Sequence, residues 1–518
     1  MVKIGEHAVV LGASMGGLLA ARVLADFYEA VTVVERDVLT DDSANRRGVP
    51  QGQHGHVVLP RCSQVLSELF PGFLEGLVAD GVPVWDDGDL ARVDVSVGGH
   101  RFCRSGTLSN RDAHQYYPSR PFLESQLRRR LQAIPNVKLL DGHDVAGLTA
   151  NNDRVTGARV VNRHGGGETT VTADLVVDAT GRGSRTPTFL DELGYGRPRE
   201  DEVVVQLAYA SQLLRIPPGT LDVGLFGVFP GPSRPTTFSF VGYENDTWMV
   251  TLGGMLGQQP PTEWAAMLKF GEQLASASVL AALRDAELLE EPARYRVPSN
   301  RWRRYDKMRR IPDGLIVFGD AICSFNPIYG QGMTVASTEA IVLRDCLRRG
   351  DRDLPRRFFR ATAKKIRVAW QMAAGSDLTL PEVVGPRPLS MRITNAYIDR
   401  VLTAAETDPV VAEQFLRVSG MIDPPARLLR PSLMIRVART NRRRRRTDDG
   451  RRNAFQQLGV GKPQHPLSTS QLGTDVEPDK PEDDEQEQQV PFVFQARERH
   501  RAQQRQGHIR KSFPRLSF

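Results

Sequence analysis

Cysteine is scarce in this chain, with four among 518 residues. Cys62, Cys103, Cys323 and Cys346 lie far apart and form neither a CxxC pair nor the spacing of a metal site. A disulfide framework and a cysteine-ligated metal are therefore not expected. Such cysteine usage is typical of a reducing compartment, so we expect a cytoplasmic protein without a bound metal.

Long apolar runs are missing as well. No stretch approaches the roughly eighteen apolar residues that cross a bilayer. The first apolar run contains glycines and begins a strand, so it does not have the pattern of a signal peptide. Aromatic residues make up only 7%, whereas the chain has 46 glycines. This composition and length predict a large α/β protein with more than one domain.

Acidic residues do not balance the basic ones, and the formal net charge is +7. Much of the basic excess lies near the C-terminus, including the run Arg442–Arg446. No folded nucleic-acid-binding module accompanies this run, so no specific nucleic acid is expected as a partner. Residues 442–518 are rich in Gln, Pro and charge and poor in apolar residues, which predicts a disordered tail.

Residues 7–35 have the pattern of a strand–turn–helix–strand unit. The turn Gly12-Ala13-Ser14-Met15-Gly16-Gly17 follows an apolar strand and resembles a dinucleotide fingerprint with Ser14 in place of the middle glycine. Glu35 ends the second strand at the distance expected of an acid that binds ribose hydroxyls. The unit predicts dinucleotide binding by Gly12, Ser14, Gly16, Gly17, Glu35 and Arg36.

A second strand–turn–helix pattern covers residues 315–347. An apolar strand ends at Gly319-Asp320, and Pro327, Gly330, Gln331, Gly332 and Met333 form a turn into a helix. The N-terminal N–H groups of that helix would face whatever the turn encloses, which favours negative charge. An acid, a proline and two glycines before a helix predict a cofactor site.

These two patterns, with a third at Asp178-Ala179-Thr180-Gly181-Arg182-Gly183, resemble the motifs of FAD-dependent single-component monooxygenases. Within that family, which includes aromatic hydroxylases, the chain looks closest to the polyene and polyether epoxidases. The resemblance covers roughly residues 5–440. It implies that Asp320 binds the ribityl and pyrophosphate part of FAD, and that the Pro327 turn lies against the flavin ring.

Two basic positions are further candidates for FAD contacts. The loop Arg46-Arg47-Gly48-Val49-Pro50-Gln51-Gly52-Gln53-His54 resembles the family loop that crosses the cofactor. Arg46 and Arg47 both remain open for the phosphate contact, and Arg47 is the residue that we predict. Arg120 lies at the start of a helix capped by Ser119, where similar flavoproteins place an arginine against FAD. His54 and His56 lack a third ligand, so they predict no metal site.

The resemblance also implies a fold and a reaction. We expect a Rossmann-like FAD-binding domain of the glutathione-reductase type over 1–200 and 301–350, with a mostly antiparallel β-sheet substrate domain over 81–117 and 201–300. A helical region would follow over 351–441. The reaction would insert one oxygen atom from O2 into a hydrophobic alkene or aromatic ring through a flavin C4a-hydroperoxide. No catalytic side chain is predicted, because the cofactor carries the chemistry.

Several points stay open at this stage. NAD(P)H is the expected electron donor, but Arg182-Gly183 stands where many hydroxylases have Asp-Gly, so a partner flavin reductase is an alternative. An FAD-dependent alkene reductase of the geranylgeranyl reductase type and a non-catalytic FAD-fold lipid carrier also remain. A halogenase is disfavoured, because Trp302-Arg303-Arg304 does not supply the Trp-x-Trp-x-x-Pro signature.

Two expectations concern apolar surfaces. Residues 428–437 alternate apolar and basic residues, which predicts either a docked helix or peripheral membrane contact. The inserted sheet offers candidates for a substrate wall, with the ordinary core of the sheet as the alternative. The candidates are Phe226, Phe229, Phe238, Phe240, Trp248 and Met255.

Overall fold

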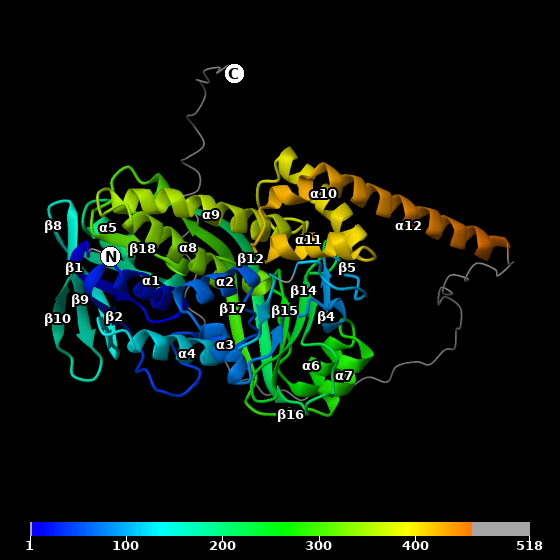
Figure 1. The fold of residues 1–518 in the computed structure, drawn as a ribbon, viewed down its shortest axis with the longest axis horizontal. Coiled ribbons are helices and arrows are strands. Elements are labelled where there is room, and N and C mark those ends of the chain that lie inside the picture. Colours follow the sequence, from blue (N-terminus) through cyan, green and yellow to red (C-terminus); the bar gives the residue numbers. More distant parts are fainter. Residues whose placement is uncertain (1–2, 111, 458–518) are drawn as a thin grey trace, which may run out of the picture. The chain divides into compact units, whose positions relative to one another are not determined.

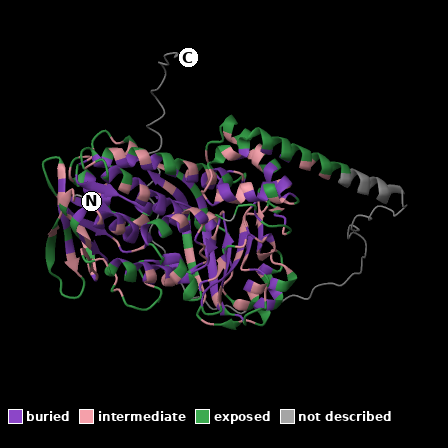
Figure 2. Ribbon diagram, viewed as in Figure 1, coloured by how far each residue is buried: buried purple, intermediate pink, exposed green. Residues whose placement is uncertain are grey.

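The computed structural model describes residues 3–110 and 112–457, with side chains up to residue 446. The chain divides into residues 1–453 and 454–518, and the fold belongs to the first of these units. Two large sheets and the helices packed on them form that unit (Figure 1). Figure 2 shows that the strands and the helices next to them are mostly buried, so the core lies along the sheets.

A five-stranded parallel sheet has the order β18-β11-β1-β2-β7. Its strands are β1 (Gly5–Leu11), β2 (Tyr28–Val34), β7 (Val137–Leu140), β11 (Leu175–Asp178) and β18 (Leu315–Val317). The helices α1 (Met15–Ala25), α4 (Arg120–Gln132) and α8 (Gly332–Leu347) pack in this region. Because all four strand pairs are parallel, the motifs that follow β1, β2, β11 and β18 meet at one edge. The predicted Rossmann-like architecture is confirmed.

A three-stranded sheet lies beside the parallel sheet. It consists of β8 (His143–Asn151), β9 (Arg154–Asn162) and β10 (Glu168–Thr172). Further α-helices and strands of the N-terminal half are α2 (Pro60–Leu69), α3 (Phe73–Ala79), α5 (Thr186–Glu192), β3 (Val84–Trp85) and β6 (Gln115–Tyr116).

A nine-stranded sheet forms the second layer and is antiparallel except where β13 pairs with β4. Its strands are β4 (Val93–Val97), β5 (His100–Arg101), β12 (Glu200–Arg215), β13 (Leu225–Val228), β14 (Thr236–Gly242), β15 (Thr247–Gly254), β16 (Glu287–Leu288), β17 (Ala293–Arg303) and β19 (Cys323–Ser324). The helices α6 (Trp264–Gly271) and α7 (Ala277–Arg284) cover one of its faces. The predicted mostly antiparallel insertion is therefore present.

The C-terminal part is helical, as predicted. It contains α9 (Leu354–Asp377), α10 (Leu389–Ala405), α11 (Pro409–Ser419) and α12 (Pro431–Gln457). The predicted disordered tail from Arg442 needs correction at its start, because α12 continues to Gln457. Arginine is a good helix former, and Arg444 pairs with Glu406 of α10 at 2.6 Å. Residues 458–518 lie outside the described part of the chain. Among the helices that are described, none combines the length and apolar character needed to span a membrane.

Candidate cofactor and substrate site

A cavity of about 610 Å³ lies between the edge of the parallel sheet and the nine-stranded sheet. The turns after β1, β11 and β18 all line it, together with strands of the second sheet. Of the predicted site residues, the structure brings thirteen to this cavity: Gly12, Ser14, Gly16, Glu35, Arg36, Arg120, Gly319, Asp320, Pro327, Gly330, Gln331, Gly332 and Met333. Gly17 and Arg47 are not among the lining residues.

Gly17 acts through backbone packing instead. A Cβ atom at Gly17 would lie 1.8 Å from the carbonyl oxygen of Gly12, and one at Gly12 would lie 2.7 Å from that of Ala179. Gly12 also has a φ of 99°, which favours glycine. Gly16 differs, because its Cβ would meet only the ring of Phe318, at 3.5 Å. Gly12 and Gly17 therefore allow the close backbone contacts of the turn, whereas Gly16 borders open space in the cavity.

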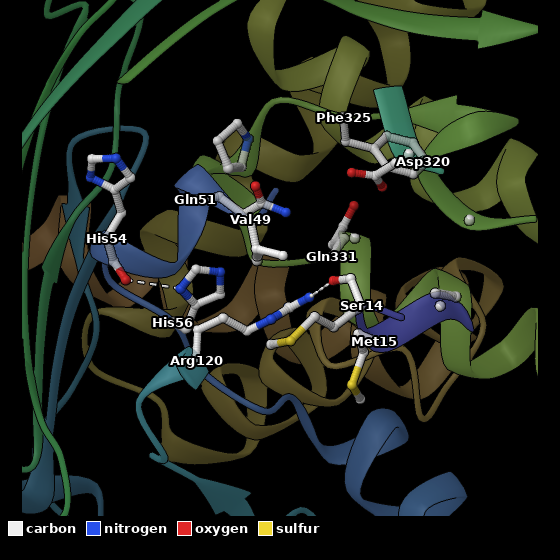
Figure 3. A pocket seen from close by; sticks show the side chains of 18 of the residues that line it. Ser14, Met15, Val49, Gln51, His54, His56, Arg120, Asp320, Phe325 and Gln331 are labelled. Atoms are coloured by element: carbon white, nitrogen blue, oxygen red, sulfur yellow. Dashed lines mark hydrogen bonds between the residues drawn. The ribbon is translucent and has the colours of Figure 1, made fainter. Parts of the chain in front are cut away.

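A cluster of charges supports the first turn. The Ser14 hydroxyl donates to Glu124 Oε1 at 2.6 Å, and Arg120 donates to both Ser14 Oγ at 3.0 Å and Glu124 at 2.8 Å. Figure 3 shows Arg120 pointing across the cavity toward Ser14. Although burial opposes ionisation of Glu124, Arg120, Arg46 and Ser14 together lower its pKa to about 2. Glu124 is thus an anion that positions two arginines beside the turn.

Arg46 joins this cluster, and Arg47 does not. The Arg46 guanidinium lies 2.9 Å from Glu124, 3.2 Å from Glu35 and 3.4 Å from Asp37. Its buried Nε has no hydrogen-bond partner in the described structure. Arg47 is exposed and lines a separate cavity of about 560 Å³ on the other side of the loop. The geometry therefore favours Arg46 over the predicted Arg47 for a phosphate contact.

Glu35 and Arg36 follow β2 and line the same cavity. Glu35 is buried and accepts a hydrogen bond from the Ala13 backbone N–H at 2.7 Å. This bond ties the end of β2 to the turn after β1, where the fingerprint places a ribose. Arg36 is exposed and lies 4.0 Å from Asp144. It lines both cavities.

The Gly319-Asp320 motif rests on a buried glutamate. The Asp320 side chain is exposed to the cavity (Figure 3), but protein surrounds that cavity, and the resulting desolvation raises the pKa of the carboxyl. Below it, Glu339 of α8 is fully buried and accepts a hydrogen bond from the Gly319 N–H at 2.6 Å. Burial raises the pKa of Glu339 to about 8, and its Oε1 has no partner in the described structure. At neutral pH, the Glu339 side chain is therefore neutral and supports the Gly319-Asp320 motif from the side away from the cavity.

The Pro327 turn is held by a second buried acid. Asp377, at the end of α9, accepts hydrogen bonds from Asn326 Nδ2 at 3.0 Å, the Tyr329 hydroxyl at 2.9 Å and Asn300 Nδ2 at 2.6 Å. The Asn326 side chain in turn accepts the Ile328 N–H at 3.0 Å. Burial raises the pKa of Asp377 to about 6. This network joins β17, the turn and α9, and it fixes the turn over the cavity.

The turn after β11 is organised by Asp178. Its carboxylate accepts from the Thr180 hydroxyl and the Thr186 hydroxyl, both at 2.6 Å, and from the Ser184 hydroxyl at 2.5 Å. Arg182 donates to the Ser299 carbonyl at 2.7 Å and to Ser324 Oγ at 2.8 Å. Asp178 thus tethers its own loop, and Arg182 fastens that loop to the nine-stranded sheet.

The substrate-wall prediction selected mostly the wrong face of that sheet. Phe226, Phe238 and Phe240 pack under α6 and α7 with Trp248, and Met255 is buried in another cluster. Of the six candidates, Phe229 lines the cavity. The alternate positions of the same strands face the cavity, because side chains in a strand point to opposite faces in turn. They include Leu225, Thr237, Ser239, Val241 and Thr251.

His54 and His56 also line the cavity. His54 Nδ1 lies 2.8 Å from Ser211 Oγ, and its ring lies between those of Tyr209 and Tyr295. His56 Nδ1 lies 2.8 Å from the His54 carbonyl oxygen. Burial lowers the pKa of His54 to about 4 and that of His56 to about 3. Both are neutral at neutral pH, and the Nδ1 of each has a partner within the protein, whereas the buried Nε2 of His54 has none in the described structure. Within residues 3–110 and 112–457, no three His, Cys, Asp or Glu residues form a group suited to a metal ion.

The cavity fits a long cofactor with an anionic centre. One end offers Glu35 and the arginine cluster, and the N-termini of α1 and α8 face the middle. The other end is the Pro327 turn, where Gln331 has a buried Oε1 without a partner in the described structure. Sequence reasoning missed Glu124, Glu339 and Asp377. Glu124 followed the Ser119 cap on a predicted helix, but Asp377 carried no local signal.

Known proteins resemble this chain in sequence and in fold. A family model described as FAD binding domain matches residues 6–348. Protein Rv3254 of Mycobacterium tuberculosis is 40% identical over 429 residues, which cover 81% of this chain and 90% of that protein. Kynurenine 3-monooxygenase of Salinispora tropica is 28% identical over 356 residues, which cover 66% of this chain and 72% of that enzyme.

Solved structures show the same fold at low sequence identity. The flavin-dependent brominase Bmp2 superposes with a TM-score of 0.58 at 15% identity, covering 86% of this chain and 100% of that one. The p-nitrophenol 4-monooxygenase PnpA of Pseudomonas putida superposes with a TM-score of 0.57 at 16% identity, covering 81% and 99%. At this level of identity, the likeness concerns the fold alone.

Proposed function

We propose an oxygen-insertion reaction for this chain, which belongs to the FAD binding domain family and is an FAD-dependent monooxygenase. In this reaction, one atom of O2 enters a hydrophobic substrate. The reaction would be epoxidation of an alkene or hydroxylation of an aromatic ring. The observation that carries this proposal is the cavity, which joins the two strand–turn–helix motifs to the open face of a β-sheet.

The lining of the sheet side supports a hydrophobic substrate. Val93, Val95, Leu225, Phe229 and Val241 contribute apolar surface there, opposite the Pro327 turn. Hydrophobic side chains with a few polar groups are typical of small-molecule sites. Among the polar groups near this wall, Ser211 and Thr251 bond to each other and His54 Nδ1 bonds to Ser211, but the buried His54 Nε2 has no hydrogen-bond partner in the described structure. The wall therefore offers mainly an apolar, uncharged surface, with the neutral His54 Nε2 as one polar atom left unpaired in the described chain.

The cofactor carries the oxygen chemistry, and the chain provides its setting. FAD, when bound, supplies electron transfer and the activation of O2. Ser14, Arg46, Arg120 and Asp320 would hold its phosphate and sugar part, and the Asp377 network would keep the Pro327 turn in place against the ring. Two electrons and a proton from reduced nicotinamide, with one further proton, balance the reaction: one oxygen atom enters the substrate and the other leaves as water.

The electron donor is proposed as NAD(P)H, with a partner flavin reductase as the alternative. Arg182 occupies the position of an acid in many hydroxylases, and its guanidinium bonds to Ser299 and Ser324. These hydrogen bonds fix the loop, and the Arg182 guanidinium does not line the cavity. Reduction of the purified enzyme by NADH or NADPH alone, followed at the flavin absorbance, distinguishes the two donors.

Replacement of one carboxylate tests the cofactor site. We expect Asp320→Ala to strip FAD from the purified protein, because the carboxylate faces the cavity at the end of β18. Asp313→Ala, the same change at an exposed acid before that strand, is the control and should retain FAD. Full retention of FAD by Asp320→Ala would contradict the assignment of the site.

Reaction with oxygen tests the chemistry. The reduced enzyme would be mixed with isotopically labelled O2 and a panel of lipophilic alkenes and arenes, and the products analysed by mass spectrometry. One labelled oxygen atom per product supports the monooxygenase proposal. Saturated product formed without oxygen would replace it with an alkene reductase, and a protein purified without flavin would favour a lipid carrier.

A further inference from the structure

Exposed apolar side chains gather on α10, on α12 and in the loops before them. Val384 is 82% exposed, Leu389 69% and Ile393 62%. Leu429 is 57% exposed, Ile435 51% and Met434 43%. We call these six residues the apolar face. Of the eleven large apolar residues that are exposed in the described chain, seven lie between positions 384 and 435, and such a concentration indicates an interaction surface.

The two helices lie side by side (Figure 1). The Tyr397 hydroxyl of α10 donates to the carbonyl of Leu428 at 2.6 Å, and Asn441 of α12 donates to the carbonyl of Arg400 at 3.0 Å. Their inner sides, including Val401 and Val437, are buried in one core cluster. Figure 2 shows that the remaining surface of both helices is largely exposed. The apolar face is therefore not the side by which these helices dock on the protein.

The same region is strongly basic. From Pro424 to Arg446 the sequence contains nine arginines and neither aspartate nor glutamate. Arg436 pairs with Asp408 at 2.7 Å, and Arg444 pairs with Glu406. Arg430 and Arg439 are exposed and form no ion pair with any residue in the described part of the chain. An apolar surface bordered by cationic side chains complements an anionic, partly apolar partner.

We propose that the apolar face binds the surface of a bilayer that contains anionic lipids. In this arrangement α10 and the first turns of α12 lie in the interface, with aliphatic side chains inserted below the lipid phosphates and arginines level with them. A nucleic acid would use the arginines but leave six aliphatic side chains in water. A bilayer satisfies both features of the surface.

The position of the face relates it to the cavity. Met372 and Ser376 of α9 and Phe415 and Leu416 of α11 line the cavity. Asn395 of α10 donates to the carbonyl of Gly375 at 3.3 Å, next to one of these lining residues. The apolar face thus adjoins the helices that wall the cavity, which suits a substrate dissolved in lipid. This link rests on the proposed function, whereas binding to vesicles does not.

Sedimentation of the full-length, FAD-loaded protein with vesicles tests the proposal. Vesicles of phosphatidylcholine alone would be compared with vesicles that also contain phosphatidylglycerol. We expect binding to the anionic vesicles and about tenfold weaker binding by Ile393→Glu, because a charge replaces an inserted side chain. Leu288→Glu is the matched control: Leu288 is 46% exposed on β16, far from α10 in Figure 1, and should bind as the wild type does.

The arginines need their own variant. Arg430→Gln with Arg439→Gln should weaken binding to anionic vesicles about fivefold or more and flatten its dependence on salt. Flavin absorbance of every variant confirms that the fold is retained. No binding to anionic vesicles, or equal binding by Ile393→Glu and Leu288→Glu, would overturn the proposal. If analytical ultracentrifugation without lipid showed a dimer for the wild type and a monomer for Ile393→Glu, the face would instead bind a second copy of the chain.

Discussion

The carboxylate of Asp377, on the last residue of α9, accepts a hydrogen bond from the side chain of Asn326 at 3.0 Å. Asn326 opens the turn that contains Pro327, and Asp377 is fully buried beneath it. The same carboxylate also accepts from Tyr329 and Asn300. One acid that never faces the cavity therefore sets the shape of the turn against which the flavin ring is proposed to lie.

Asp377→Asn should loosen this turn. An amide places an N–H group where the carboxylate accepted a hydrogen bond, so one donor would face another donor in a buried site. We expect the free energy of unfolding to fall by about 1–3 kcal/mol. We also expect the absorbance of bound FAD to shift, because the turn moves. Urea unfolding and a flavin spectrum at saturating FAD measure the two effects, and an unchanged spectrum would argue against contact between this turn and the ring.

Asp377 also predicts a dependence of stability on pH. Its pKa is raised from 3.8 to about 6 by burial, so the folded state binds its proton more tightly than the unfolded state. The contribution to stability is complete below the unfolded pKa and is lost as the pH rises to the folded pKa. Between about pH 4 and pH 6, this group should lower the free energy of unfolding by at most about 3 kcal/mol. The difference between wild type and Asp377→Asn across that range isolates it, and parallel profiles would contradict the prediction.

Glu339→Gln should be tolerated and even stabilising. Burial raises the pKa of Glu339 from 4.5 to about 8, and its Oε2 accepts the Gly319 N–H. Glutamine keeps an acceptor for that bond and never ionises. As the pH rises from about 4.5 to about 8, wild type should lose stability relative to this variant, by at most about 5 kcal/mol. Urea unfolding of both proteins over this range measures the loss. Glu339→Ala, which removes the acceptor, is the control and should weaken FAD retention.

The sequence predicted those parts of the site that depend on the local conformation of the backbone. The turn at Gly12–Gly17 and the turn at Gly319–Gly332 need glycine at fixed positions after an apolar strand, so spacing alone locates them. Parallel strands then bring both turns to one edge of a sheet. Asp377 had no such signal, because it sits in a helix far along the chain from Asn326 and becomes important only through packing.

Other places where the structure differs from the sequence-based expectation have similar physical causes. Phe238 and Phe240 were candidates for the substrate wall, but the sequence could not show that α6 and α7 cover their face of β14. Arg46 and Arg47 are chemically alike in one loop, and only the approach of Glu124 from α4 separates them. The arginines of α12 looked like a disordered tail because their contacts lie in α10. In each case, the missing information was which element packs against which.

Two neighbouring glycines should respond differently to the same substitution. Gly17→Ala would place a Cβ atom 1.8 Å from the Gly12 carbonyl oxygen, so the turn cannot close and we expect little soluble protein. Gly16→Ala meets only Phe318 at an ordinary contact distance, so the protein should fold. If FAD approaches the backbone here, Gly16→Ala should bind FAD about tenfold more weakly. Soluble yield and FAD titration of the apoprotein measure both, and normal FAD affinity in Gly16→Ala would place the cofactor away from this turn.

The two adjacent arginines provide the last test. Arg46 lies among Glu35, Asp37 and Glu124 and lines the cavity, whereas Arg47 is exposed outside it. Hydrogen bonds to charged groups contribute about 1.5–3 kcal/mol each. We therefore expect Arg46→Ala to weaken FAD binding by at least about tenfold, because a phosphate loses its cation and Glu124 repels it.

Arg47→Ala is the matched control, since it removes the same side chain one residue away. Its affinity for FAD should stay within about twofold of wild type, because an exposed arginine outside the cavity contributes little. Titration of each apoprotein with FAD, followed by quenching of flavin fluorescence, gives the two dissociation constants. A larger loss for Arg47→Ala than for Arg46→Ala would return the phosphate contact to Arg47, as the sequence predicted. It would also mean that the loop between β2 and α2 changes conformation when the cofactor binds, so that Arg47 enters the cavity.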